Sequence, residues 1–381
     1  MEANSAKSTT SASSLRWKIL RRSLIRRPSS NSAGHRFKSW KQLLAEMQGS
    51  TGNNLSTSHG RGKVSVHSTL PRLRFVGFHW ICGCCVPEDK SEMEDKSEMG
   101  IQRISRKATH GFNLIPFHLM KDRAEENANS SKENPMDSSR DATLCYTLPV
   151  PNAPQLILHQ RVDDMAHLND FEVCNRYDID NTGLVCQWPS EDVLAHYCLS
   201  HASIFRQKRV LELGSGYGLA GLIVAMATEA REVFISDGNP QVVDYIQCNV
   251  NANSGSFGGT EVKPLMLHWG REKDYDISNT FDVIIASDCT FFKEFHGALV
   301  QTIKSLLKEE GPSEAILLSP KRGDSLDKFL IQVRDSGLHF RTDEIYDEEV
   351  WRRHQGFVEG DDSWPNYEKD HCYPLLVRIT R

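Results

Sequence analysis

The chain has 381 residues, a net charge of −5 and a hydrophobic share of 39%, which is below the usual share of a globular protein. The length allows two average domains, but the apolar deficit lies in the N-terminal part, and the charge gives no overall attraction to nucleic acid. No uncharged stretch could span a bilayer, since Phe75 to Val86 is too short and three prolines interrupt Ala142 to Gln160. The ten cysteines follow no regular framework, so we expect reduced thiols and a location in cytoplasm and nucleus.

Residues 1 to 100 are rich in Ser, Lys, Arg, Asn and Gly, which predicts a mostly disordered tail. One segment, Leu15 to Arg27, is strongly basic and would place Trp17, Leu20 and Leu24 on one face of a helix. Three interpretations stay open for it. It is an organelle transit peptide, a basic amphipathic helix of the kind that calmodulin or a membrane surface binds, or a solvated tail.

A cysteine cluster and a short repeat follow in the same tail. His79, Cys82, Cys84 and Cys85 lie close together, but adjacent cysteines rarely ligate one ion, so we predict no metal site. The hexad E-D-K-S-E-M then occurs twice between Glu88 and Met99, which is too short and polar for a repeat fold. We interpret this stretch as an acidic linker.

Residues 101 to 180 are predicted to form a small extension ahead of the main domain. Apolar residues and prolines suggest short strands near Phe112 to Phe117, at Tyr146 to Val150 and at Gln155 to His159. We expect these strands to form a small β layer. The main domain is expected from residue 181 to residue 381.

The main domain is predicted to open with a turn, a strand and a helix. The turn Asn181-Thr182-Gly183 leads into a short strand from Gly183 to Gln187. Ser190 after Trp188-Pro189 has the properties of an N-cap, and acids follow in the first turn. This pattern predicts a helix that begins at Ser190.

The strongest pattern of the chain is V-L-E-L-G-S-G-Y-G-L-A-G, from Val210 to Gly221. A short apolar strand comes first, three alternate glycines follow, and Leu219 to Ala227 reads as a helix. Gly214, Gly216 and Gly218 let the backbone bend tightly and approach a ligand, to which the helix presents its free N–H groups. The stretch therefore predicts a loop that holds a small cofactor.

The residues around the glycines indicate which cofactor. A dinucleotide fingerprint needs a small residue where Leu219 stands, so a dehydrogenase is disfavoured. With Glu212 before the glycines, the loop instead resembles motif I of the class I methyltransferases, which hold S-adenosylmethionine. The second strand, Val233 to Ser236, ends in Asp237, whose carboxylate can accept hydrogen bonds from both ribose hydroxyls.

The remaining chain alternates strands and helices, which predicts a doubly wound, mostly parallel α/β sheet. The expected elements are strands at Glu261–Leu267, Phe281–Ser287, Ala315–Ser319, His339–Ile345 and Pro374–Ile379 and helices at Phe292–Leu307 and Leu326–Ser336. No convincing helix separates the last two strands, so we expect them to close the sheet as an antiparallel hairpin. A seven-stranded, Rossmann-like sheet with an antiparallel closing strand favours a methyltransferase.

Ligands of an open α/β sheet bind at the carboxyl ends of its strands, where Trp269 and Asp288 are expected. Trp269 is a candidate to stack on adenine. Methyl transfer needs a neutral lone pair that is aligned for in-line displacement. Asp288 is expected to orient an amine and balance its charge, and Phe291 to offer a ring face to a methylated ammonium. Alternatively, Asp288 is a helix N-cap.

Several segments together resemble the class I, seven-strand protein-lysine methyltransferases. They are N-T-G-L-V-C-Q-W-P-S-E-D-V-L-A-H-Y-C from Asn181, E-L-G-S-G-Y-G-L-A-G from Glu212, S-D-G-N from Ser236, L-H-W from Leu267, S-D-C-T-F-F from Ser287 and the tail from Tyr346 to Thr380. The resemblance covers roughly residues 101 to 381 and is strongest to the enzymes of this family that methylate calmodulin. It implies S-adenosylmethionine as cofactor and adds Trp188, Glu212, Asn239 and Ser287 to the expected cofactor-binding residues.

The resemblance also implies the acceptor: one lysine of calmodulin, in the loop between its last two Ca²⁺-binding motifs, which receives up to three methyl groups. The chain departs from the family at Phe291, where a tyrosine is frequent, and at His268, where an aspartate is frequent. The alternatives are another protein lysine and a binding module without turnover. We further expect a monomer that binds no nucleic acid, and a tethering role for Leu15 to Arg27 if calmodulin binds there.

Overall fold

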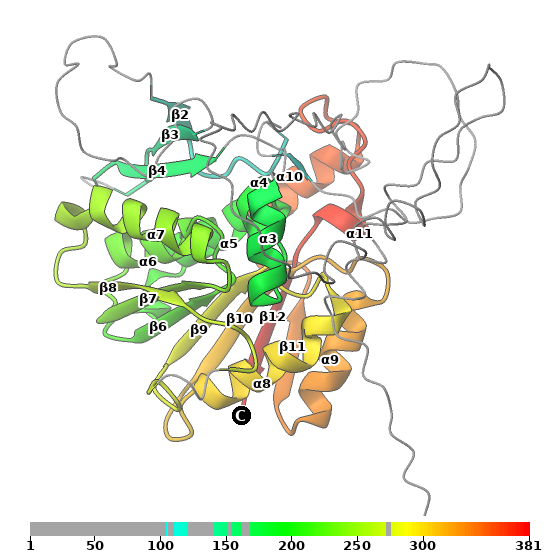
Figure 1. Cartoon of the computed structure of the whole chain (residues 1–381). Coiled ribbons are helices and arrows are strands. Elements are labelled where there is room, and N and C mark those ends of the chain that lie inside the picture. The colour runs from blue at the N-terminus through cyan, green and yellow to red at the C-terminus, as the bar shows by residue number, and fades with distance from the viewer. Residues whose placement is uncertain (1–103, 106–109, 121–140, 151–153, 162–167, 272–275) are drawn as a thin grey trace, which may run out of the picture. The chain divides into compact units, whose positions relative to one another are not determined.

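The computed structural model describes residues 104–105, 110–120, 141–150, 154–161, 168–271 and 276–381 (Figure 1). The predictions for the basic segment Leu15 to Arg27, the cysteine cluster and the acidic hexads lie outside these residues. Within the described part of the chain, no helix is both long enough and apolar enough to cross a membrane.

A seven-stranded sheet forms the centre of the fold, in the order β11-β12-β10-β9-β6-β7-β8. Its strands are β6 Arg209–Leu213, β7 Glu232–Asp237, β8 Glu261–Met266, β9 Val283–Ser287, β10 Glu314–Ser319, β11 His339–Asp343 and β12 Leu375–Thr380. The strands β6 to β10 run parallel, and β12 is antiparallel to both of its neighbours, β10 and β11. The predicted α/β sheet with its antiparallel closing strand is therefore confirmed.

Helices cover both faces of this sheet and bury a separate apolar core on each side (Figure 1). One face carries α5 Pro189–Ser200, α6 Leu219–Ala227 and α7 Pro240–Ala252, and the other carries α8 His296–Leu306 and α9 Ser325–Asp335. Side chains alternate across a strand, so Val210 of β6 joins the first core and Leu211 joins the second. The predicted helix at Leu219 to Ala227 is confirmed with the same bounds.

The opening of the main domain differs from the prediction. The expected strand from Gly183 to Gln187 is largely one helical turn, α4 Thr182–Val185, followed by the short β5 Cys186–Gln187, which pairs with β1 Ile104–Ser105. The backbone N–H groups of Leu184 and Val185 both donate to the Asn181 carbonyl, which closes the turn. Ser190 is wrong as the N-cap of α5, because the helix begins at Pro189, a residue that suits the first helical position.

The expected small β layer is present as a three-stranded antiparallel sheet. It consists of β2 Phe117–Leu119, β3 Asp141–Tyr146 and β4 Leu156–Arg161. The prediction placed a strand after Tyr146, whereas β3 ends there, and Phe112 to Ile115 is irregular backbone that is largely buried. The layer and its strand near Gln155 to His159, which overlaps β4, were therefore predicted correctly, whereas the positions of the other two strands were wrong.

Two asparagines at the C-terminal end of α7, Asn249 within the helix and Asn253 as its C-cap, fasten this small sheet to the main domain. Asn253 accepts from the Ile157 N–H at 2.9 Å and donates to the Ile157 carbonyl at 2.7 Å. Asn249 makes the same pair of bonds with His159, at 2.7 and 3.1 Å. The side-chain amides thus supply β4 with the partners that a neighbouring strand would give, because an amide carries both a donor and an acceptor.

The segment between β11 and β12 holds a helix that sequence reasoning missed. It contains α10 Glu348–Val358 and the short α11 Lys369–Cys372. Asp347 caps α10, since its side chain accepts from the Glu349 and Val350 N–H groups at 3.0 Å. Val350, His354 and Phe357 are buried at helical spacing, but the polar residues between them concealed the pattern.

Candidate active site

The glycine loop between β6 and α6 has the backbone that only glycine adopts without strain. Gly214, Gly216 and Gly218 have φ values of 58°, 55° and 83°. A Cβ on Gly214 would lie 2.8 Å from the Cys289 sulfur and 3.1 Å from the Trp269 ring. The loop, the chain after β9 and the Trp269 side chain therefore meet at one point.

Asp237 ends β7 beside this loop, where the sequence predicted a ribose ligand. Its carboxylate accepts from the Gly216 N–H at 3.2 Å and from the Asn239 N–H at 2.9 Å. Burial raises the pKa of Asp237 to about 6, and the nearby Asp180 carboxylate acts in the same direction. The carboxylate is thus fixed in place by backbone donors at the carboxyl end of the sheet.

Glu212 lies on the α6 side of β6, the same face as Val210. Its carboxyl oxygen accepts from the Gly221 N–H at 2.8 Å and is buried beneath the loop. Burial raises the pKa of Glu212 to about 8. These contacts favour support of the glycine loop from within the core, and a direct contact of Glu212 with the cofactor stays a prediction.

The helical turn α4 packs against Asp237 and the glycine loop, a contact that was not predicted from the sequence. A Cβ on Gly183 would lie 3.4 Å from the Asp237 carboxylate and 3.7 Å from the Gly216 Cα. The Tyr217 hydroxyl, next in the loop, donates to the Leu184 carbonyl at 2.7 Å and ties α4 down. The one signal in the sequence was Gly183 itself, since a glycine permits such close approach of two backbones.

Three other predicted cofactor ligands lie at the same carboxyl end of the sheet. Trp269 follows β8, with its ring centroid 6.3 Å from that of Phe295, and Ser287 is the last residue of β9. Asn239 is the N-cap of α7, and its side-chain oxygen accepts from the Gln241 N–H at 3.0 Å. That bond leaves the buried side-chain amide nitrogen of Asn239 without a hydrogen-bond partner.

Asp288 follows β9 in the left-handed region, with φ of 54°. It does not cap the helix that follows it in sequence. One carboxylate oxygen accepts from the Ser190 N–H of α5 at 3.0 Å, and the other lies 2.5 Å from a guanidinium nitrogen of Arg322. The alternative function of Asp288 as a cap is therefore present, but on α5, and the side chain is almost fully buried.

Phe291 and Trp188 form two aromatic walls next to Asp288. Their ring centroids are 5.3 Å apart, and the Arg322 guanidinium carbon lies 5.1 Å from the Phe291 centroid and 4.8 Å from the Trp188 centroid. Trp188 thus faces Phe291 and Arg322 in the structure, while its expected contact with the cofactor stays a prediction. Sequence reasoning missed Arg322, whose signal was its place in the K-R-G-D loop directly after β10.

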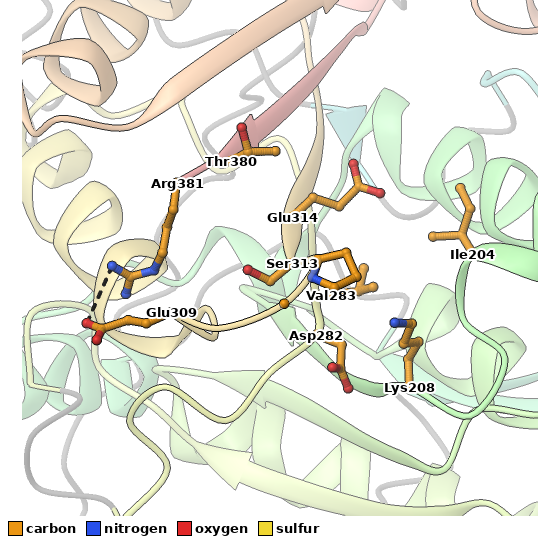
Figure 2. Close-up of a pocket in the computed structure, with 11 residues that line it drawn as sticks. Ile204, Lys208, Asp282, Val283, Glu309, Ser313, Glu314, Thr380 and Arg381 are labelled. Carbon is orange, nitrogen blue, oxygen red and sulfur yellow. Dashed lines mark ion pairs between the residues drawn. The ribbon is translucent and has the colours of Figure 1, made fainter.

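A cavity of about 540 Å³ lies at the opposite end of the sheet, where the parallel strands begin (Figure 2). Charged residues line it, and several form ion pairs: Asp282 with Lys308 at 2.5 Å, Glu314 with Arg378 at 2.7 Å and Arg381 with Glu309 at 3.6 Å. Ligands of this fold class bind at the carboxyl ends instead. The candidate site is therefore the edge that carries the glycine loop.

The arrangement fits S-adenosylmethionine. The glycine loop forms a cradle that a side chain at Gly214 would fill, and Asp237 offers carboxylate oxygens beside it. Among the described residues, no group of three or more His, Cys, Asp or Glu side chains is placed to hold a metal ion.

The family comparison gives a match across this site. The sequence model of a family described as lysine methyltransferase matches residues 177–336. The calmodulin-lysine N-methyltransferase of Arabidopsis thaliana is 58% identical over 287 residues, which cover 75% of this chain and 91% of that protein. The protein-lysine N-methyltransferase EEF2KMT of Mus musculus is 28% identical and covers 42% of this chain and 51% of that protein.

Solved structures that match this chain have lower sequence identity to it. That of a SAM dependent methyltransferase from Aquifex aeolicus has 15% sequence identity and a TM-score of 0.34, and it covers 50% of this chain and 92% of that chain.

Proposed function

The chain belongs to the lysine methyltransferase family that includes the calmodulin-lysine N-methyltransferase of Arabidopsis thaliana, and we propose that its acceptor is a lysine of calmodulin. It is an S-adenosylmethionine-dependent protein-lysine N-methyltransferase. One observation carries the assignment of its site. Cys289 contacts the glycine loop. Asp288 directly precedes Cys289 in the chain, and Phe291 follows shortly after it, so the proposed lysine site lies next to the proposed cofactor site.

The residues at the carboxyl edge suggest how the cofactor would be held. The loop of Gly214, Gly216 and Gly218 would enclose its methionine part, Asp237 would accept from the ribose and Trp269 would lie against the adenine. The cofactor supplies a methyl group that is activated by a positively charged sulfur. Every further requirement of the reaction falls on this chain: binding the lysine, aligning its nitrogen and excluding water.

The residues after β9 suit an amine that must react in its neutral form. A lysine amine is mostly protonated at pH 7, and an apolar, desolvated site lowers its pKa. The Trp188 and Phe291 rings provide apolar walls, and the nearby Asp288 carboxylate can accept a hydrogen bond from the amine. Transfer leaves the methylated nitrogen with a positive charge, which Asp288 and the ring faces would stabilise.

The direct test is intact-mass spectrometry of calmodulin after incubation with the full chain and S-adenosylmethionine. We expect a gain of up to three methyl units, all on one lysine. A calmodulin variant with that lysine replaced by arginine is the matched control and should gain none. If calmodulin gains no mass while other proteins of a lysate become methylated, the acceptor is another protein lysine.

The proposal also gives the N-terminal segment Leu15 to Arg27 a use. Calmodulin is acidic and grips basic helices with bulky apolar anchors, so this segment would tether the substrate and raise its effective concentration. Removal of residues 1 to 100 should raise the apparent KM for calmodulin and leave kcat unchanged. An unchanged KM would refute the tether and favour a transit peptide or a plain tail. A monomeric state and a cytoplasmic and nuclear location remain part of the same proposal.

A further inference from the structure

The loop Lys321 to Asp324, between β10 and α9, places a cation inside the proposed lysine site. Arg322 has a φ of 46°, in the left-handed region that non-glycine residues rarely adopt. Its backbone N–H donates to the Asp370 carbonyl at 2.8 Å, and the Gly323 N–H donates to the Asp370 carboxylate at 2.6 Å. The backbone of the loop is therefore held by the segment at α11, which leaves the Arg322 side chain to run inward.

The Arg322 guanidinium occupies a site that would suit an organic cation. Its carbon lies 4.8 Å from the Trp188 ring centroid and 5.1 Å from that of the neighbouring Phe291, and one of its nitrogens lies 2.5 Å from an Asp288 carboxylate oxygen. The Arg322 side chain is only 7% exposed. Two aromatic faces and one carboxylate are also what a lysine ammonium or its methylated product requires.

Arg322 and a substrate lysine cannot both use the same two rings and the same carboxylate. We infer that Arg322 is a built-in competitor for the lysine subsite, which the side chain of the substrate lysine displaces before methyl transfer. This inference rests on the proposed function of the site. It makes Arg322 a specificity-determining residue, because a displaced guanidinium needs a new partner.

The chemistry of the substrate decides whether displacement occurs. A protein with carboxylates near its target lysine offers the released Arg322 guanidinium a second ion pair, whereas free lysine or a neutral peptide offers none. The site then selects lysines in acidic surroundings. An acidic protein such as calmodulin meets that condition.

The first experiment uses Arg322→Ala and tetramethylammonium as a probe cation, followed by tryptophan fluorescence. The variant is expected to bind the probe roughly tenfold more tightly than the unaltered chain, because the two rings and Asp288 become free for a cation. Arg352→Ala is the matched control, since Arg352 pairs with Glu349 on the exposed face of α10, and it should bind like the unaltered chain. Equal binding by all three proteins overturns the inference.

The same variant separates displacement from a positioning role. We expect Arg322→Ala to lower the KM for calmodulin several-fold and to methylate a neutral lysine peptide faster than the unaltered chain does. If instead kcat falls while the folded state and the affinity for S-adenosylhomocysteine are retained, Arg322 orients Asp288 for the reaction and the competitor role is wrong.

A second experiment needs no variant and so remains decisive if Arg322→Ala fails to fold. Phenylglyoxal modifies exposed arginines, and peptide mapping reads the rate at Arg322 with and without saturating tetramethylammonium, which fills the subsite and offers no carboxylate to the released guanidinium. Displacement predicts faster modification of Arg322 when the probe is bound, and slower or unchanged modification overturns it. If calmodulin proves not to be a substrate at all, the proposed acceptor fails, while the tetramethylammonium titration still decides the role of Arg322.

Discussion

The pKa values of buried acidic groups are shifted in opposite directions at the two ends of the seven-stranded sheet. At the amino end, burial of Asp282 acts to raise its pKa, but the Arg209 N–H and Lys308 outweigh it and lower the pKa. At the carboxyl end, Glu212 and Asp237 receive hydrogen bonds from backbone N–H groups, and burial raises their pKa values to about 8 and 6. The amino end is electrostatically satisfied, whereas the carboxyl end holds buried carboxyls that a cationic ligand would suit.

This difference explains why the cavity at the amino end is not the candidate site. The cavity at the amino end is lined by charges that already have partners, so a ligand there would compete with ion pairs (Figure 2). At the carboxyl end, Asp288 and Arg322 have strained backbone, and the pKa of the nearby Asp237 carboxyl is raised. Strained backbone and shifted pKa values occur together most often at functional sites. Four substitutions would test this contrast.

Asp288→Ala should have the largest effect. It would leave Arg322 buried without its carboxylate and remove an acceptor at the start of α5, which costs about 3–5 kcal/mol in the free energy of unfolding. Methyl transfer should slow as well, while affinity for the cofactor is largely retained in the folded protein. Urea denaturation and turnover at saturating substrates measure the two effects, and wild-type turnover would reduce Asp288 to a cap of α5.

Asp237→Ala should weaken cofactor binding with little effect on the fold. Two charge-assisted hydrogen bonds to ribose are worth about 2–4 kcal/mol, or roughly 30-fold to 1,000-fold in affinity. Calorimetry with S-adenosylhomocysteine reads the change directly. Asp282→Ala is the matched control at the other end and should leave the affinity unchanged, so an equal loss in both variants would erase the contrast between the two ends.

Glu212→Gln should change how stability depends on pH. The folded pKa of about 8 lies above the ordinary value of 4.5, so the folded chain keeps a proton that the unfolded chain releases. The free energy of unfolding therefore falls as pH rises from about 4.5 to 8 and levels off above. Glutamine still accepts from Gly221 but does not ionise, so the variant should be about 1–3 kcal/mol more stable than the unaltered chain at pH 8. Identical pH profiles would contradict the raised pKa.

Glu314→Gln at the amino end should have the smallest effect. The Glu314 and Arg378 side chains make a bidentate pair at 2.7 and 2.8 Å, but both are partly exposed. Such a pair contributes about 0.5–1 kcal/mol, and salt screens it. Thermal unfolding at low and high salt measures the loss, and methyl transfer should stay as it is. A large drop in activity would mean that this end takes part in the reaction.

Sequence reasoning placed the elements whose signals are local. The apolar runs of β6, β7, β9 and β10 and the Gly214-x-Gly216-x-Gly218 pattern fix the sheet and its glycine loop without reference to distant residues. Asp237 could be found for the same reason, since it ends a strand at a known distance from the loop. These features depend on periodicity and backbone geometry.

What the sequence concealed depends on contacts between distant segments. Asp288 lies 98 residues from the Ser190 N–H that it accepts, and Arg322 enters the site from a loop that has no cofactor motif. The helix α10 was missed because its buried stripe of Val350, His354 and Phe357 includes a histidine and is broken by charged residues. Which polar group satisfies which partner is decided only when the chain is folded.

The most direct test of the contrast between the two ends compares the rates at which three proteins methylate calmodulin: the unaltered chain, Asp288→Asn and Asp282→Asn. Intact-mass spectrometry follows the gain of methyl units in parallel reactions at saturating S-adenosylmethionine. Both asparagine variants keep the size of the side chain. We expect the Asp282 variant to match the unaltered chain and the Asp288 variant to be at least about tenfold slower, because a neutral amide no longer balances the charge on the acceptor nitrogen. Equal rates for all three, or loss of activity in the Asp282 variant alone, would contradict the placement of methyl transfer at the carboxyl end.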